Sequence, residues 1–152
     1  ERDGVTKRGP SDPVRVVFVC LGNICRSPTA EAVMVQLVKQ AQLGDRVEID
    51  SAGTGSWHIG EQRDARSRAV GQRRGMPLRG VARQISKADF EHFDYVIAMD
   101  RDNRDTLRGL APDDAAAEKV RLLRTFDPAS PTDAEVPDPY YGGPEGFDEV
   151  FD

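Results

Sequence analysis

The sequence lacks a long apolar run, and it has few of the residues that build disulfide scaffolds or metal sites. No apolar segment among its 152 residues approaches the roughly 20 that a membrane span needs, and no hydrophobic signal core precedes the first strand. Its 2 cysteines and 2 histidines fit neither a secreted disulfide framework nor zinc-ligand spacing. We therefore expect no metal, no membrane span and a reducing, cytoplasmic compartment. Export without a signal peptide stays open.

Positive charge is also scarce. The chain has 21 lysines and arginines against 26 aspartates and glutamates, a net charge of −5, whereas a general nucleic-acid binder is basic. We expect no nucleic-acid partner and a monomer. The length suits one domain over residues 13–152, after an extension over residues 1–12 that is disordered or a remnant of cloning. An ordinary solvated face is expected for five arginines: Arg63, Arg66, Arg68, Arg73 and Arg74.

Strand and helix patterns alternate along the chain, which predicts a parallel sheet with right-handed crossovers. Apolar, β-branched runs predict strands over residues 14–19, 47–50, 95–98 and 120–123. Helical spacing and capping residues predict helices from Pro28 (with Ser27 as N-cap) to Gly44, over 65–75, after a Ser86–Asp89 capping box, and from Asp100 to about Gly109. Ligands of such sheets bind beyond the carboxyl ends of the strands.

The first of these carboxyl ends carries "CLGNICRSP" over residues 20–28. Backbone N–H groups after the strand can curl into a nest, and the following helix adds its unpaired N-terminal donors. The Walker pattern G-x-x-x-x-G-K-[ST] is absent. We call residues 20–27 the anion loop and expect it to bind phosphate or another oxyanion. Its phosphate-binding members would be Leu21, Gly22, Asn23, Ile24, Cys25 and Ser27.

Cys20 and Arg26 form a C-x5-R pattern across this loop. A thiol close to a helix N-terminus and an arginine ionises readily. The planar fork of Arg26 suits two phosphate oxygens, so a Cys20 thiolate beneath the phosphate could attack phosphorus in line. The alternative is a buried cysteine beside a surface arginine. The pattern between a buried strand and a capped helix favours catalysis.

Two separated segments, "VCLGNICRSPTAEAV" and "DPYYG", resemble the signature and the acid loop of the bacterial low-molecular-weight protein tyrosine phosphatases. "DSAGT", "VARQISKADF" and "FDYVIAMD" are similar to internal segments of that family, so the resemblance spans nearly the whole chain. It implies a three-layer α/β fold, with a four-stranded parallel twisted sheet and helices on both faces. It also implies cofactor-free hydrolysis of phosphotyrosine in proteins through a phosphocysteine.

The same resemblance assigns roles to individual residues. Cys20 would be the nucleophile, Arg26 the phosphate clamp and Asp138 the general acid. Asn23 would hold the loop in shape, and Ser27 would donate a hydrogen bond to the Cys20 sulfur.

Asp138 lies between two prolines, and Asp127-Pro128 is a second Asp-Pro pair in the same segment. Spacing alone does not choose between the two aspartates. The neighbouring Tyr140 and Tyr141 favour Asp138, because aromatic side chains beside the acid would enclose a phenyl ring. A departing phenolate needs a proton from such an acid.

The opposite wall of the substrate cleft would, by resemblance, come from Leu21, Ile24, Trp57 and His58. Trp57-His58 could instead be an exposed loop with a half-buried aromatic. Cys25 is either a packed thiol or, as the family suggests, a redox partner that captures oxidised Cys20 as a disulfide.

The chain departs from the family at two places. Gly80 stands where many relatives carry a histidine that braces Asn23, so we expect another residue, such as Ser51, to brace the loop. The sequence stops at Asp152, where relatives continue through a final helix, and we expect the full protein to be longer.

Three other functions compete with this hypothesis. An arsenate reductase on the same fold needs further redox cysteines, and none follows Cys25. A protein-arginine phosphatase typically has threonine at the position of Ile24. A phosphopeptide-binding module without turnover would need neither Cys20 nor Asp138.

Overall fold

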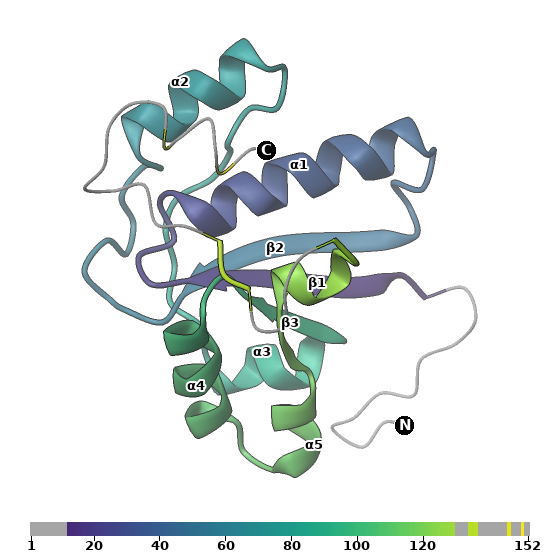
Figure 1. The fold of residues 1–152 in the computed structure, drawn as a ribbon, viewed down its shortest axis with the longest axis vertical. Coiled ribbons are helices and arrows are strands. Elements are labelled where there is room, and N and C mark those ends of the chain that lie inside the picture. Colours follow the sequence, from purple (N-terminus) through teal and green to yellow (C-terminus); the bar gives the residue numbers. More distant parts are fainter. Residues whose placement is uncertain (1–11, 130–133, 137–145, 147–149, 151–152) are drawn as a thin grey trace.

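The computed structural model describes residues 12–129, 134–136, 146 and 150. Within these residues the chain forms one parallel sheet in the order β2-β1-β3-β4 (Figure 1). The strands are β1 (Val14–Cys20), β2 (Val47–Gly53), β3 (Tyr95–Ala98) and β4 (Val120–Leu122). The helices are α1 (Arg26–Gln40), α2 (Ala65–Arg73), α3 (Lys87–His92), α4 (Arg101–Leu110), α5 (Asp114–Glu118) and the 3-10 helix η1 (Leu123–Phe126).

Alternate residues of β1 point to opposite faces of the sheet, and both faces are covered by helices. Phe18 packs in a cluster with Met34 of α1, whereas Val19 packs with Phe90 of α3 and Leu107 of α4. Figure 1 shows α1 and α2 on one side of the sheet and α3, α4 and α5 on the other. The predicted three-layer α/β fold with a four-stranded parallel sheet is therefore confirmed.

The central position of β1 places the anion loop at the middle of one sheet edge. β1 pairs with β2 on one side and with β3 on the other, and its last residue is Cys20. The carboxyl ends of β2 and β3 lie at the same edge, because all three strands are parallel. Segments that follow these strands can therefore reach the loop.

The predicted start of the first long helix was wrong by two residues. α1 begins at Arg26 with Cys25 as N-cap, and the Cys25 carbonyl accepts the N–H of Thr29 at 3.1 Å. Ser27 is therefore inside the first turn, where its hydroxyl lies beside the Cys20 sulfur rather than capping the helix. Pro28 is tolerated there, because first-turn N–H groups have no partner within the helix.

Candidate functional site

The anion loop bends sharply at Asn23, which has a φ of 57°. Asparagine is one of the few residues other than glycine that adopt this left-handed conformation at moderate cost. The bend returns the backbone toward the end of β1, so the Asn23 N–H donates to Cys20 Sγ at 3.3 Å.

The sulfur of Cys20 lies in a buried, polar environment at the base of this loop. Cys20 is 3% exposed, and its Sγ is 3.0 Å from Ser27 Oγ. Both contacts are of the kind that stabilises a sulfur anion, since an N–H and an O–H can donate to it. The N-terminus of α1, a 15-residue helix, adds its positive dipole end.

The side chain of Asn23 is completely buried and ties the loop to three other segments. Its Nδ2 donates to Ser27 Oγ at 2.9 Å and to Ser51 Oγ at 3.0 Å. Its Oδ1 accepts from Arg63 Nη1 at 2.7 Å and from the backbone N–H of Arg83 at 2.9 Å. All hydrogen-bonding positions of this amide are therefore used, which holds its orientation.

Ser51 links Asn23 to the half-buried carboxyl group of Glu31. Its hydroxyl donates to Glu31 Oε1 at 2.6 Å, and Glu31 lies 3.7 Å from the guanidinium of Arg63. Burial raises the pKa of Glu31, because it outweighs the Ser51 hydrogen bond and the charge of Arg63, which act in the opposite direction. Ser51 does contact Asn23, as expected from the absence of a histidine at position 80, but it is one of several partners.

The prediction of a solvated face was wrong for Arg63. This side chain is 4% exposed, and its Nη1 donates to both the backbone oxygen and Oδ1 of Asn23, each at 2.7 Å. The other four arginines of that group are exposed, as predicted. No local pattern distinguishes Arg63 from them, because its burial depends on residues distant in the sequence.

Arg26 is held at the opposite side of the loop. Its Nη1 donates to Asp100 Oδ2 at 2.7 Å and to the carbonyl of Val136 at 3.2 Å, and the side chain is 4% exposed. Asp100 was predicted only as a helix cap, a role that it also has, since its Oδ1 accepts the N–H of Asn103 at 2.7 Å. One aspartate thus fixes both the start of α4 and the direction of Arg26.

The residues expected in the cleft wall have different environments. Leu21 and Trp57 are exposed, the latter by 70%, and His58 is half-buried. The His58 ring lies against Gly22, since its Cδ2 is 3.0 Å from the place of a Cβ on that glycine. Ile24 is 8% exposed and packs in a core cluster, which includes Cys25.

Cys20 and Cys25 are not joined by a disulfide. Asp138, Tyr140 and Tyr141 lie outside the residues that the structure describes. Asp127, the alternative candidate for the acid, is described: its Oδ1 accepts the N–H of Ala129 at 2.9 Å, so it is used in a local turn.

Among the described residues, no group of three or more His, Cys, Asp or Glu side chains could hold a metal ion. In the same part of the chain, none of the helices has the length and apolarity to cross a membrane.

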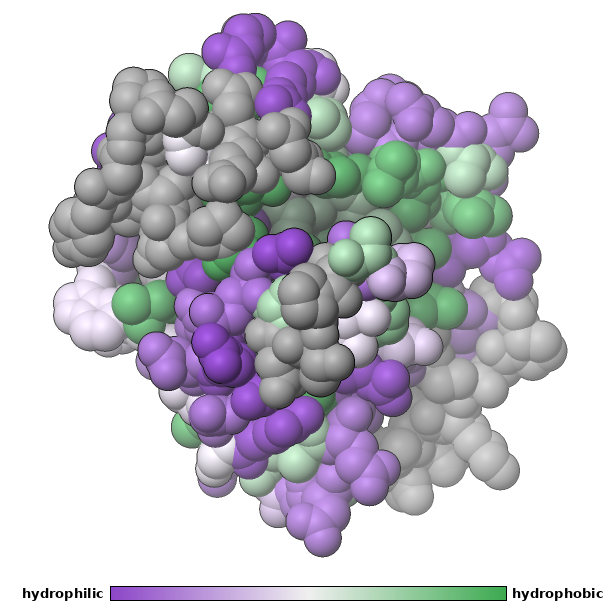
Figure 2. Space-filling model, viewed as in Figure 1, coloured by the Kyte–Doolittle hydropathy of each residue, from purple (hydrophilic) through white to green (hydrophobic). Residues whose placement is uncertain are grey.

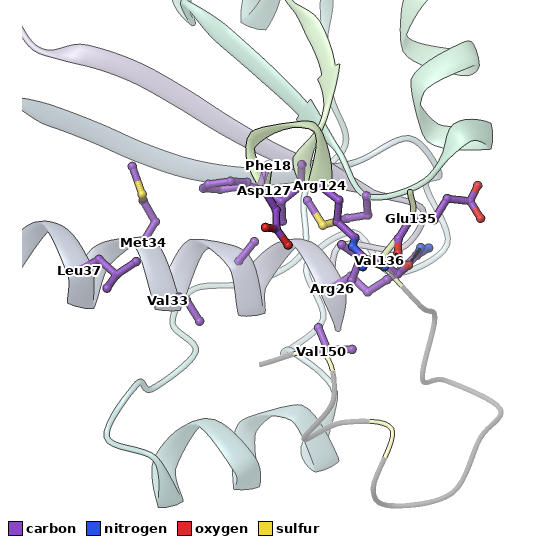
Figure 3. Close-up of a pocket in the computed structure, with 13 residues that line it drawn as sticks. Phe18, Arg26, Val33, Met34, Leu37, Arg124, Asp127, Glu135, Val136 and Val150 are labelled. Atoms are coloured by element: carbon purple, nitrogen blue, oxygen red, sulfur yellow. Dashed lines mark hydrogen bonds between the residues drawn. The ribbon is translucent and has the colours of Figure 1, made fainter. Parts of the chain in front are cut away.

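An apolar groove runs from Arg26 along α1. Figure 2 shows hydrophobic side chains gathered in this region, and Figure 3 shows Met34 and Leu37 of α1 beside Phe18 of β1, with Arg26 and Val136 at the other end. The groove offers few hydrogen-bond donors apart from Arg26 and Arg124, so an oxyanion fits the anion loop better than the groove.

Comparisons with known proteins agree with this geometry. A family model described as "Low molecular weight phosphotyrosine protein phosphatase" matches residues 15–152. The low molecular weight protein-tyrosine-phosphatase of Streptomyces coelicolor is 52% identical over 139 residues, which cover 91% of this chain and 85% of that protein.

Solved structures match as well. A protein tyrosine phosphatase from Entamoeba histolytica with Hepes in the active site aligns with a TM-score of 0.86 at 44% identity, over 91% of this chain and 87% of that one. Wzb from Vibrio vulnificus, in complex with benzylphosphonate, aligns with a TM-score of 0.77 at 26% identity, over 91% and 89%.

Proposed function

This chain belongs to the low-molecular-weight protein tyrosine phosphatase family, and on that premise we propose that Cys20, Arg26 and Asp138 hydrolyse phosphotyrosine in proteins. The Cys20 thiolate attacks phosphorus while Arg26 binds two equatorial oxygens of the phosphoryl group. Asp138 protonates the departing phenolate. Water then cleaves the phosphocysteine, and the sulfur leaves as a thiolate that accepts a hydrogen bond from Ser27.

The observation that carries this proposal is the environment of the Cys20 sulfur. It lies buried at the end of β1 with the Asn23 N–H at 3.3 Å and the Ser27 hydroxyl at 3.0 Å. A structural cysteine in an apolar core would have no such donors. The same donors that stabilise the anion for attack also stabilise it when it departs.

The test is hydrolysis of p-nitrophenyl phosphate by the wild type and two variants. Cys20→Ser is expected to abolish turnover, and Asp138→Asn is expected to lower kcat by about 10²–10⁴-fold, the usual contribution of a general acid. Asp127→Asn is the matched control, because it removes the second Asp-Pro carboxyl, and kcat should not change. Activity that depends on Cys20 and persists in a chelator fits the mechanism. Loss of activity with the chelator, or an effect of Asp127→Asn equal to that of Asp138→Asn, contradicts it.

The preferred substrate is an aromatic phosphate ester. Support comes from the His58 ring, which lies against Gly22 of the loop, from the exposed side chains of Leu21 and Trp57, and from the related Wzb, which is in complex with benzylphosphonate, a phosphonate that carries a phenyl ring. A panel of matched phosphotyrosine, phosphoserine and phosphoarginine peptides checks this preference. Equal kcat/KM for the three peptides would contradict it.

Cys25 provides reversible protection against oxidation. It lies five residues from Cys20 in the same loop, and the two cysteines are not joined by a disulfide. Peroxide should oxidise Cys20 to a sulfenic acid. The Cys25 thiol then condenses with this sulfenic acid, which gives a disulfide and water. A thiol reductant should then restore activity in the wild type. If Cys25→Ala recovers as fully, Cys25 does not have this role.

We also propose that the enzyme acts as a cytoplasmic monomer. Two cysteines of one loop that are not joined by a disulfide suit a reducing compartment, in which disulfides do not persist. Light scattering on the purified protein and fractionation of the source cells test the two parts separately. A stable dimer, or recovery of the protein outside the cells, would overturn the corresponding part.

A further inference from the structure

Arg63 is a buried cation that the proposed mechanism does not use. Its side chain is 4% exposed, although arginine is rarely buried unless it is paired. All three nitrogen atoms of its guanidinium donate hydrogen bonds. Nη1 donates to the backbone oxygen and Oδ1 of Asn23, Nη2 donates to Ser51 Oγ at 3.4 Å, and Nε donates to the carbonyl of Arg79 at 3.1 Å. Such a complete set of partners indicates a specific position rather than incidental burial.

We propose that Arg63 is the positioning residue that holds the anion loop in its phosphate-binding shape, and that Gly80 makes this possible. The inference rests on the proposed function of the loop. Arg63 donates to the backbone oxygen and the side chain of Asn23 at once, each at 2.7 Å. These two bonds fix both the peptide that follows the bend and the amide that contacts Ser27, so one guanidinium constrains two groups beside the sulfur.

The backbone around Arg63 is itself held against the loop. The N–H of Asp64 donates to the carbonyl of Ile24 at 2.9 Å. Residues 60–62 also form a short antiparallel pairing with residues 81–82, through Gly60 N–H to Ala82 O at 2.8 Å and Ala82 N–H to Glu61 O at 2.9 Å. The backbone at Arg63 is therefore fixed on both sides: by the pairing of residues 60–62 before it and by the hydrogen bond between Asp64 and Ile24 of the anion loop after it.

Gly80 lies beside the guanidinium and turns the chain toward it. Its φ is +77°, a conformation that L side chains rarely adopt, and this turn directs the Arg79 carbonyl to Arg63 Nε. A Cβ on Gly80 would be 3.5 Å from Arg63 Nη2. Any side chain longer than alanine would thus compete with the guanidinium for the same space.

The charge of Arg63 is balanced within this network. Burial lowers the pKa of Arg63, because it outweighs the nearby negative charges of Glu31 and Asp50, which act in the opposite direction. Glu31 lies 3.7 Å away and also accepts from Ser51, so the carboxyl group, the serine and the arginine surround Asn23 as one connected set. A lysine could keep the charge but could not reproduce the fork geometry.

The experiment compares Arg63→Met, Arg63→Lys and, as a matched control, Arg73→Met, an exposed arginine of α2. The readouts are kcat for p-nitrophenyl phosphate and the inhibition constant of inorganic phosphate, which does not depend on the fraction of active enzyme. We expect Arg63→Met to weaken phosphate binding by about 10-fold and to lower kcat by about 10–100-fold, as misplacement of a positioned group does. Arg63→Lys should lie between Arg63→Met and the wild type, and Arg73→Met should match the wild type.

A purely structural role predicts a different pattern. It would lower the melting temperature and the amount of folded enzyme, but phosphate inhibition of the remaining enzyme would not change. Phosphate binding and kcat within about twofold of wild type for folded Arg63→Met would overturn the proposal. If Arg63→Met does not fold, Arg63→Lys decides by the same criterion. If the wild type itself shows no turnover, the proposed function fails, whereas direct titration with phosphate still tests the bracing by Arg63.

Discussion

At the scale of single residues, the amide of Asn23 controls the direction in which the Ser27 hydroxyl donates. Its Oδ1 accepts from Arg63, which can only donate, so its Nδ2 must face the oxygen of Ser27. The Ser27 hydrogen is then free for the Cys20 sulfur at 3.0 Å, in preference to the carbonyl of Ala52 at 3.4 Å. The donor to the sulfur is therefore ordered by a residue that does not itself react.

Asn23→Asp tests this ordering. A carboxylate has no N–H, so Ser27 would donate to it and leave the departing sulfur without its hydrogen bond. Hydrogen bonds to charged groups contribute about 1.5–3 kcal/mol, so we expect kcat to fall by about 10–100-fold. Phosphocysteine breakdown should become limiting, which rapid-mixing kinetics would detect as a burst of p-nitrophenol. Unchanged kcat without a burst would contradict this account.

Gly53→Ala tests how closely β2 approaches the loop. A Cβ at Gly53 would lie 2.7 Å from the backbone oxygen of Leu21 and 3.2 Å from Asn23 Cβ, so the loop backbone would have to move. We expect a loss of about 1–3 kcal/mol in the free energy of unfolding, typical of overpacking, and weaker inhibition by phosphate. Urea denaturation and inhibition kinetics measure the two effects.

Gly44→Ala is the control for this substitution. Gly44 lies in the turn after α1, and a Cβ there would have no neighbour within 4 Å. It should leave phosphate inhibition as in the wild type. If the two alanine variants behave alike, close packing at Gly53 is not what shapes the loop.

The sequence predicts the loop residues better than it predicts their supports. Cys20, Asn23 and Ser27 lie in one short motif, and the structure brings them into contact. Arg63 is 40 positions from Asn23, and its contacts depend on how two loops pair in the folded chain. Nothing within a local window of sequence separates Arg63 from the exposed arginines that follow it, and nothing there marks Glu31 as a partner of Ser51 and Arg63.

At the scale of secondary-structure elements, α2 begins at a side chain that joins it to the site. Asp64 is its N-cap and accepts from the N–H groups of Arg66 at 2.8 Å and Ser67 at 3.4 Å. Burial alone would raise the pKa of Asp64, but the hydrogen bonds from Arg66 and Ser67 outweigh burial and lower it. A capped α2 keeps the preceding residue, Arg63, in place.

Asp64→Ala is expected to lower the free energy of unfolding by about 1 kcal/mol at neutral pH, the usual effect of losing an N-cap. Because the folded pKa is below the ordinary value of 3.8, the charge of Asp64 stabilises the fold above that pH, and this contribution is lost as the pH falls through the lowered pKa. Urea denaturation at pH 7 and pH 3 measures the difference.

Asp64→Asn separates the cap from the charge. Asparagine caps helices as well as aspartate does, so this variant should keep most of the stability and lose the pH-dependent part. Asp45→Ala, which removes an exposed aspartate in a turn, is the matched control. An equal loss for Asp64→Ala and Asp45→Ala would show that the cap does not stabilise α2.

The elements that the sequence predicts best are those with caps and apolar periodicity. β3 covers the predicted residues 95–98, α4 follows its Asp100 cap, and the capping box of Ser86 and Asp89 is present. α5 was not predicted, because its five residues bury only Ala116 and show no periodic pattern. β2 is longer than predicted, since pairing with β1 continues to Gly53 after the apolar run ends.

At the scale of the whole molecule, the anion loop depends on contacts between distant parts of the chain. Asn23 receives hydrogen bonds from Arg63 and Arg83, and Arg26 is directed by Asp100, which is 74 positions away. One of the two strands that pair with β1 is β3, which comes much later in the sequence, so β1 has both of its partners only after β3 has been added to the sheet. The loop should therefore keep its shape only while the whole domain is folded.

Urea denaturation tests this dependence. We expect activity and the circular dichroism of the helices to be lost at the same urea concentration, in one cooperative transition. A reactive loop supported only by local contacts would instead lose activity at a different concentration. Two separate midpoints would contradict the long-range account.

The distance between Asn23 and its later partners also sets the order of events during translation. The ribosome incorporates Cys20 and Asn23 early, whereas Arg83 is 60 positions further along the chain. At roughly 5–20 residues per second, this gap corresponds to about 3–12 s in which the nascent chain carries the nucleophile without its supports. We therefore expect the nascent chain to be inactive toward phosphoproteins until the second half of the chain has been synthesised and has packed against the first.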